Sequence, residues 1–142
     1  MRDDLAAANV GRSYSLAATS IAIFTFTLFF LYPQFRRGEI DALLFQATLV
    51  VMGVATFSFV FSSFYYYCVS VGRLIDDAHR ALYSQRGDRF WLVGYTLLFL
   101  APSLILFAIR LRLVGFVWLA LWLVYLLFVI WYFPKVQTGR MH

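Results

Sequence analysis

The sequence has very little charge. Of its 142 residues only 12 are Lys or Arg and 7 are Asp or Glu, so that 13% are charged and 63% are hydrophobic. An average soluble domain carries about 25% charged residues. Charges are absent altogether from four stretches, residues 13–35, 42–72, 90–109 and 113–134. A soluble fold could not cover such stretches with polar surface, which excludes a globular enzyme, a nucleic-acid-binding domain and a disordered chain.

Residues that bind metals or redox cofactors are also scarce. Cys68 is the only cysteine, which excludes a disulfide and a thiolate metal cluster. The two histidines, His79 and His142, lie outside the uncharged stretches, so two histidines cannot ligate haem between the helices. No Gly-rich phosphate loop or metalloprotease motif occurs. We therefore expect no cofactor and no bound metal.

Each uncharged stretch is long enough to cross a membrane as a helix. A hydrocarbon core of ~30 Å needs about 20 apolar residues, and backbone polar groups in lipid must be paired within a helix or a closed barrel. Runs such as 26–31 and 118–124 are apolar on every side, which is typical of helices rather than barrel strands. The sequence therefore predicts an all-α, single-domain protein over residues 1–142. It is expected to be an integral membrane four-helix bundle with spans at approximately 14–33, 42–72, 90–109 and 113–133.

Capping signals predict where the first two helices end. Pro33 and the pair Arg36–Arg37 should end the first helix, and Asp41 is a suitable N-cap for the second. Leu74, Ile75, Ala78 and Leu82 continue a helical apolar stripe beyond the second stretch. We expect the second helix to continue out of the membrane with Gly87 as its C-cap, which makes the inner loop between helices 2 and 3 partly helical.

The basic residues predict the orientation of the chain. With a cytoplasmic N-terminus, the inner segments hold Arg2, Arg12, Arg73, Arg80, Arg86, Arg89, Lys135 and Arg140, and the outer segments hold Arg36, Arg37, Arg110 and Arg112. The positive-inside rule favours this arrangement, with both termini cytoplasmic. The inner basic surface, with Arg73, Arg80, Arg86 and Arg89, is expected to attract anionic lipid headgroups. Lysine is nearly absent from the 12 basic residues, which is typical of GC-rich bacterial genomes and predicts a bacterial inner membrane.

No predicted span contains an ionisable Asp, Glu, Lys, Arg or His. Such residues mark proton relays and voltage sensors, so their absence argues against both functions. The enzyme-like residues Asp76, Asp77 and His79 lie together in the inner loop. Asp76 and Arg80 are four residues apart, as are Arg73 and Asp77, which predicts salt bridges on a solvated helix rather than a metal or catalytic site.

Small and polar residues recur on single faces of the predicted helices. Close packing of small side chains and interhelical hydrogen bonds drive helix association in lipid, so such faces predict the seams of a bundle. The alternative is that the hydroxyl groups line a pore. The residues concerned are Ser13, Ser20, Thr27 and Gln34 in the first helix, and Gln46, Gly53, Thr56 and Ser63 in the second. The third helix carries Gly94, Ala101 and Ala108 at the same spacing and should be kinked at Pro102.

The fourth helix has an aromatic face, formed by Trp118, Trp122, Tyr125 and Tyr132. Indole N–H and phenol O–H groups deep in a membrane need hydrogen-bond partners. We therefore expect this face to pack against a protein partner or a bound lipid.

The pattern as a whole favours a small polytopic membrane protein that is a non-enzymatic interaction or assembly subunit. Such a subunit would form a homo-oligomer or part of a larger membrane complex and would bind no nucleic acid. The alternative is an oligomeric small ion channel or transporter with a Ser/Thr-lined pore. Four helices packed ~8–10 Å apart leave no aqueous lumen, so a pore would need several protomers around an axis. A membrane enzyme that uses Asp76 and His79 is the third class.

Overall fold

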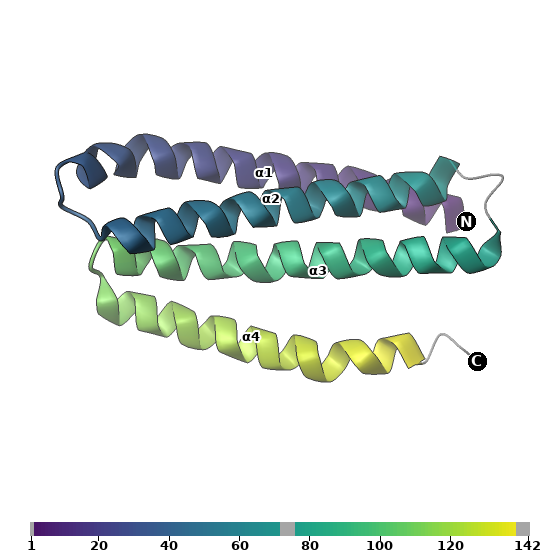
Figure 1. The fold of residues 1–142 in the computed structure, drawn as a ribbon. Coiled ribbons are helices and arrows are strands. Elements are labelled where there is room, and N and C mark those ends of the chain that lie inside the picture. The colour runs from purple at the N-terminus through teal and green to yellow at the C-terminus, as the bar shows by residue number, and fades with distance from the viewer. Residues whose placement is uncertain (1, 72–75, 139–142) are drawn as a thin grey trace.

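Four long helices make up nearly all of the described chain (Figure 1). The computed structural model describes residues 2–71 and 76–138, with side chains at 5–71, 76 and 78–131. The helices are α1 Arg2–Arg36, α2 Ala42–Val71, α3 Asp77–Ala108 and α4 Arg112–Thr138. Each contains a segment long and apolar enough to cross a membrane: Leu5–Arg36, Ala42–Val71, Ala78–Ala108 and Arg112–Trp131. The predicted all-α class and the bundle of four helices that could each span a membrane are confirmed, and together they indicate a multi-pass membrane protein.

Two helices begin earlier than the uncharged stretches suggested. α1 starts at Arg2 and α3 starts at Asp77, whereas the predicted spans begin near 14 and 90. A helix that leaves the hydrocarbon region keeps its internal hydrogen bonds, so charged residues can extend it without interrupting it. The inner loop is therefore partly helical as predicted, but its helical part belongs to α3, because α2 ends at Val71. The apolar stripe expected beyond α2 falls partly on residues 72–75, outside the described chain.

Gly87 is not a C-cap, which corrects the prediction. It lies inside α3, and a Cβ atom at this position would lie 3.2 Å from the Tyr66 ring. The glycine therefore gives an aromatic side chain of α2 room to pack on the backbone of α3.

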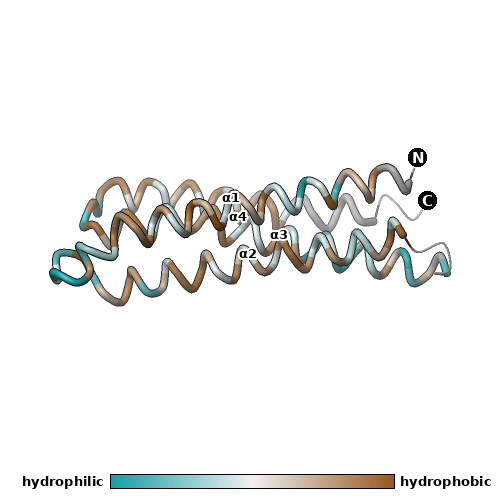
Figure 2. Tube along the Cα trace, turned by 90° about the horizontal axis from the view of Figure 1, so that it is seen from above, coloured by the Kyte–Doolittle hydropathy of each residue, from teal (hydrophilic) through white to brown (hydrophobic). Residues whose placement is uncertain are grey.

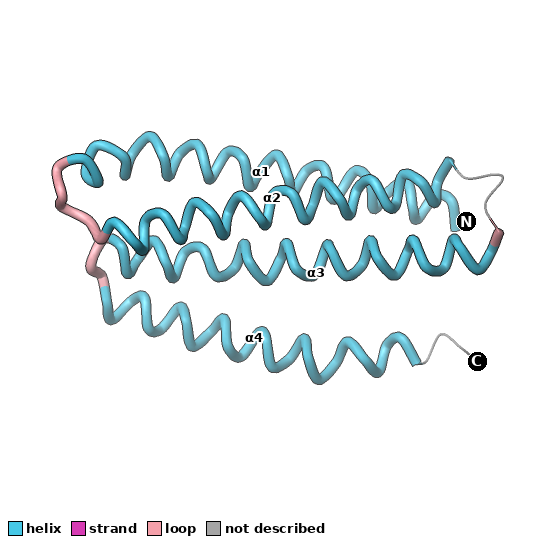
Figure 3. The backbone as a smooth tube through the Cα atoms, in the orientation of Figure 1, coloured by secondary structure: helices cyan, strands magenta, loops and turns pink. Residues whose placement is uncertain are grey.

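The loop between α1 and α2 and the loop between α3 and α4 lie at the same end of the bundle and are short (Figure 3). Pro33 lies in the last turn of α1, which continues to Arg36 instead of ending at the proline. Gly38 follows with φ +70°, and the Glu39 N–H donates to the Gln34 carbonyl over 3.0 Å. α3 ends in the same way, with Arg110 at φ 65°. Both ends are Schellman motifs, in which a left-handed residue lets the chain satisfy the last helix carbonyls.

Asp41 joins these two loops. The Leu44 N–H donates to Asp41 Oδ1 over 3.0 Å, which confirms Asp41 as the N-cap of α2. The Asp41 N–H also donates to the Ala108 carbonyl over 3.2 Å. One residue therefore begins α2 and ties it to the end of α3.

The helices pack chiefly in chain order rather than as a closed ring. α2 packs against both α1 and α3, and α4 packs mainly against α3. Figure 1 places α4 on the far side of α3 from α1 and α2. α1 begins and α4 ends at the same end of the bundle, which we call the terminal end. In Figure 2 the strongest hydrophilic colours lie toward the two ends of the bundle.

Candidate functional site

The hydroxyl stripe of α1 is buried against α2. Ser13 and Ser20 are 0% exposed and Thr27 is 4% exposed, while Gln34 is half-buried. The Ser13 and Ser62 hydroxyl oxygens lie 3.4 Å apart. In an antiparallel pair, steps of seven residues from this contact place Ser20 at the level of Ala55 and Thr27 at the level of Thr48. All of these residues are buried, so small side chains of the two helices face each other.

The face expected on α2 has to be corrected. Gln46 is exposed, and a Cβ at Gly53 would meet nothing within 4 Å, so these residues lie outside the contacts between the helices. Thr56 is half-buried and donates to the Met52 carbonyl of its own helix over 2.9 Å. Ser63 is buried. The buried face of α2 consists of Phe45, Thr48, Met52, Ala55, Ser58, Phe59, Ser62, Ser63 and Tyr66.

This face includes large side chains because α3 presents glycine to them. A Cβ at Gly94 would lie 2.9 Å from the Phe59 ring, and Phe59 itself is 0% exposed. Ala101 and Ala108 of α3 are also buried. In the contact between α2 and α3, aromatic rings of α2 therefore pack on small residues of α3. Stripes of small residues on both helices do not predict such a contact.

The aromatic face of α4 lies against α3 of the same chain, which corrects the expectation of an external partner. The Trp122 indole N–H donates to the Thr96 carbonyl over 2.8 Å, and the Trp118 indole donates to the Phe99 carbonyl over 3.3 Å. The Tyr125 ring lies 5.3 Å from the Phe99 ring, measured between centroids. The Tyr132 side chain lies outside the described part of the chain. The hydrogen-bond partners that these groups require are thus supplied internally.

Pro102 lies within α3, which continues through it to Ala108. Figure 1 shows α3 as one continuous helix. The expected kink at Pro102 stays a prediction. Beside it, Ser103 is buried and donates to the Gly115 carbonyl over 3.3 Å. Together with the two tryptophans, this bond fixes α4 along α3.

The inner basic surface lies at the terminal end. Arg86 and Arg89 are exposed on α3, Arg80 is half-buried, and Arg73 falls outside the described residues. Asp76 directly precedes α3, and its carbonyl accepts the Arg80 N–H over 3.0 Å. Among the described residues no group of three or more His, Cys, Asp or Glu side chains could hold a metal ion. The salt bridges predicted for this segment stay a prediction.

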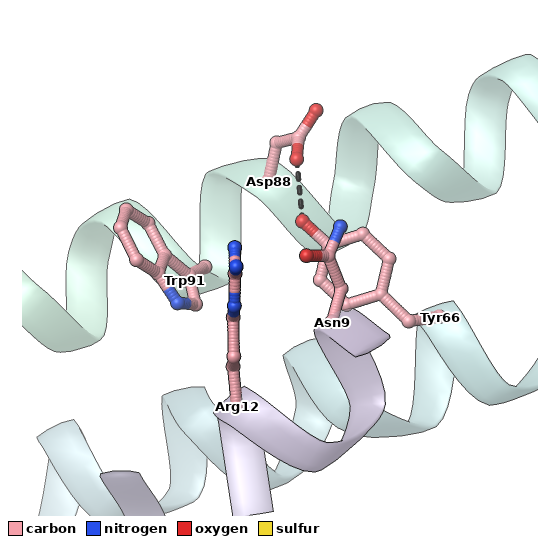
Figure 4. Close-up of a pocket in the computed structure, with 5 residues that line it drawn as sticks. All are labelled: Asn9, Arg12, Tyr66, Asp88 and Trp91. Carbon is pink, nitrogen blue, oxygen red and sulfur yellow. Dashed lines mark hydrogen bonds between the residues drawn. The ribbon is translucent and has the colours of Figure 1, made fainter. Parts of the chain in front are cut away.

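A polar pocket that sequence reasoning missed opens at the terminal end. It is lined by Asn9 and Arg12 of α1, Tyr66 of α2, and Asp88 and Trp91 of α3, and its volume is about 180 Å³ (Figure 4). The Tyr66 hydroxyl donates to Asp88 Oδ1. The only sequence signal was that Arg12 and Asp88 lie at the edges of uncharged stretches, and only the tertiary structure places them on one pocket.

α1 carries a second small-residue stripe on the face opposite its buried one. Gly11, Ser15, Ala18, Ala22 and Thr25 follow one another at steps of four and three residues, and all five are exposed. A Cβ at Gly11 would meet nothing within 4 Å. We call these five residues the outer stripe of α1. Its spacing is that of a helix face that packs closely on another helix.

Comparisons with protein-family models, with characterised proteins and with solved structures gave no match for this chain. Its function therefore has to be inferred from the arrangement of its own residues.

Proposed function

We propose that this protein is a non-enzymatic assembly subunit that binds another transmembrane chain inside the bilayer. The observation that supports the proposal is the outer stripe of α1, which leaves small side chains exposed on one face of α1 between residues 11 and 25. In lipid, small side chains let helix backbones approach closely, and this close packing drives helix association.

The outward side of α4 provides the contrast. It carries large aliphatic side chains such as Leu113, Val124 and Leu127, which are 78%, 64% and 66% exposed. Large flexible side chains suit contact with acyl chains. The outer stripe of α1 lacks such side chains, so it suits a protein helix better than lipid.

The occupant that fits the stripe best is a second copy of this chain. The chain already pairs small residues with small residues where Ser13 meets Ser62. A stripe of small residues is self-complementary, so two copies related by a two-fold axis can bring the same face together. The proposed assembly is thus a dimer through α1, alone or within a larger membrane complex.

The proposal keeps the orientation expected from the basic residues, with both termini cytoplasmic in a bacterial inner membrane. Arg86 and Arg89 are exposed at the terminal end and would face anionic headgroups there.

The test is the oligomeric state of purified protein in native lipid, measured by native mass spectrometry. Wild type should be dimeric and Ala22→Leu monomeric, because a bulky side chain on the stripe keeps the helices apart. Ala120→Leu is the matched control, since Ala120 is also exposed but lies on α4. A monomeric wild type, or a dimer that survives Ala22→Leu, overturns the proposal that a second copy of the chain binds the outer stripe. A different protein bound at α1 overturns the second copy and supports an assembly subunit.

In the alternative function, an oligomeric channel, Ser13, Ser20 and Thr27 would line the pore. These residues lie between α1 and α2, so a pore lined by them would require the two helices to separate. Solute flux into liposomes that responds to Ser20→Ala would favour this alternative over the assembly subunit.

A further inference from the structure

The polar pocket at the terminal end brings together side chains from three helices. Asn9 and Arg12 are one turn apart on α1, and Asp88 and Trp91 are one turn apart on α3. Residues three apart on a helix share a face, so each pair points toward the same space. Tyr66 of α2 lies beside Asn9 and Asp88 and is 5% exposed (Figure 4). Figure 4 shows the Arg12 side chain rising from α1 toward α3, between Trp91 and Asp88.

The pocket holds one positive and one negative group that are not paired with each other. No ion pair within 4.0 Å joins Arg12 to Asp88 or to any other carboxylate in the part of the chain that the structure describes. The Tyr66 hydroxyl donates to Asp88 Oδ1 and fixes the carboxylate, whose second oxygen accepts no hydrogen bond from the part of the chain that the structure describes. The arrangement suits a ligand that carries both charges.

The depth of the pocket in the membrane points to a lipid headgroup. Arg12 immediately precedes the uncharged stretch 13–35, and Asp88 lies two residues before the uncharged stretch 90–109. If these stretches cross the hydrocarbon region, both side chains lie at the level of the headgroups. Trp91 fits this level too, since tryptophan concentrates at membrane interfaces.

We propose that this pocket binds the headgroup of an aminophospholipid, a phosphoethanolamine, with its phosphate on Arg12 and its ammonium on Asp88. The inference requires only that the helices cross a bilayer and does not depend on whether α1 binds a second copy. The guanidinium of arginine binds phosphate oxygens through parallel N–H groups, and the Asn9 amide adds a further donor. The ammonium donates to the Asp88 carboxylate and lies against the Trp91 ring.

Charge and size both favour this headgroup. Arg12 and Asp88 give the pocket no net charge, so a purely anionic headgroup would bring its negative charge next to Asp88 without compensation. A quaternary choline ammonium has no N–H to donate to the carboxylate. The volume of about 180 Å³ is below the ~300–1,000 Å³ typical of sites for larger ligands, which suits a small headgroup whose acyl chains stay outside.

The test is a lipid titration of the purified full chain in detergent, followed by native mass spectrometry. The probes are dioleoyl phosphatidylethanolamine, phosphatidylcholine and phosphatidylglycerol. Wild type should bind the ethanolamine lipid about tenfold more tightly than the other two, as expected for one charged hydrogen bond. Equal binding of the ethanolamine and glycerol lipids would overturn the proposal.

Variants locate the binding. Arg12→Gln should weaken the binding of the ethanolamine lipid about tenfold. Asp88→Asn should remove the preference over phosphatidylglycerol. Arg36→Gln is the matched control, because it removes the same charge from an exposed arginine at the opposite end of α1, outside the pocket, and should change nothing. Equal losses in Arg12→Gln and Arg36→Gln would show a general charge effect and overturn the site. The ratio of bound ethanolamine lipid to bound glycerol lipid within one variant is insensitive to misfolding, since unfolded molecules reduce the binding of both lipids.

A soluble source is distinguished in the same experiment. Free phosphoethanolamine lacks the acyl chains and should compete at least about a hundredfold more weakly than the lipid, because chain methylenes buried outside the pocket, in the detergent micelle, contribute ~0.8 kcal/mol each. Competition at equal concentration would place the ligand in solution and overturn the lipid as occupant.

Discussion

The Trp122 indole N–H donates to the main-chain carbonyl of Thr96 over 2.8 Å, which joins α4 to α3 away from the ends of both helices. α4 has few other neighbours, because it packs mainly against α3. The indole hydrogen bonds of α4 are therefore central to its attachment.

Trp122→Phe should destabilise the protein by about 0.5–1.5 kcal/mol, because the ring is kept while the N–H donor is lost. Trp118→Phe should have a smaller effect, since Trp118 is exposed and its bond to the Phe99 carbonyl is longer, at 3.3 Å. The free energy of unfolding in mixed SDS micelles measures both. Equal losses in the two variants would contradict the importance of the Trp122 bond.

Gly94→Ala should destabilise the protein by about 1–3 kcal/mol. The new Cβ would lie 2.9 Å from the Phe59 ring, which is fully buried. Gly53→Ala is the control, because a Cβ there meets nothing within 4 Å. Alanine favours the helix by up to about 1 kcal/mol over glycine, so this variant should be neutral or more stable. Thermal unfolding in detergent compares the two, and an unaffected Gly94→Ala would refute the close contact.

Ser62→Ala should destabilise the protein by about 1 kcal/mol. The Ser62 hydroxyl donates to the Gly87 carbonyl over 2.9 Å and lies beside Ser13, so it links α2 to both of its neighbours. Ser20→Ala should be neutral or stabilising, because the Ser20 hydroxyl is buried with no hydrogen-bond partner among the described residues. The same unfolding titration separates the two variants. A larger loss for Ser20→Ala than for Ser62→Ala would contradict this assignment of hydrogen bonds.

Arg110→Gly should stabilise the protein by about 1 kcal/mol, because Arg110 has φ 65°, a left-handed conformation that a Cβ disfavours. Arg110→Ala removes the same charge and keeps the Cβ, so it should give no such gain. The unfolding temperature in detergent measures the difference. A similar increase in both variants would mean that the charge, not the backbone, is responsible.

The helix ends show how far local sequence signals reach. The position of Asp41 alone predicts an N-cap, because its carboxylate accepts a hydrogen bond from a backbone N–H only three residues away. The position of Gly87 predicts a C-cap, and this is wrong because the ring that Gly87 accommodates, Tyr66, comes from another helix. A glycine in the sequence marks both helix ends and close contacts, and only the position of the distant ring distinguishes them.

The faces of the helices were harder to predict than their bounds. Small polar residues were expected to mark the seam on α2, yet Gln46 is exposed while Phe59 is fully buried against Gly94. In lipid, apolar side chains are equally stable inside or outside, so hydropathy does not indicate which face packs inward. Complementary size decides this, and it depends on both helices at once.

The sequence alone determined that four helices are long and apolar enough to cross a membrane, because lipid requires long uncharged segments with internally paired backbones. Only the tertiary structure turned the tryptophans of α4 toward α3 and placed Arg12 and Asp88 on one pocket. These relations join residues from different helices, and the packing of side chains sets the rotation and register of each helix.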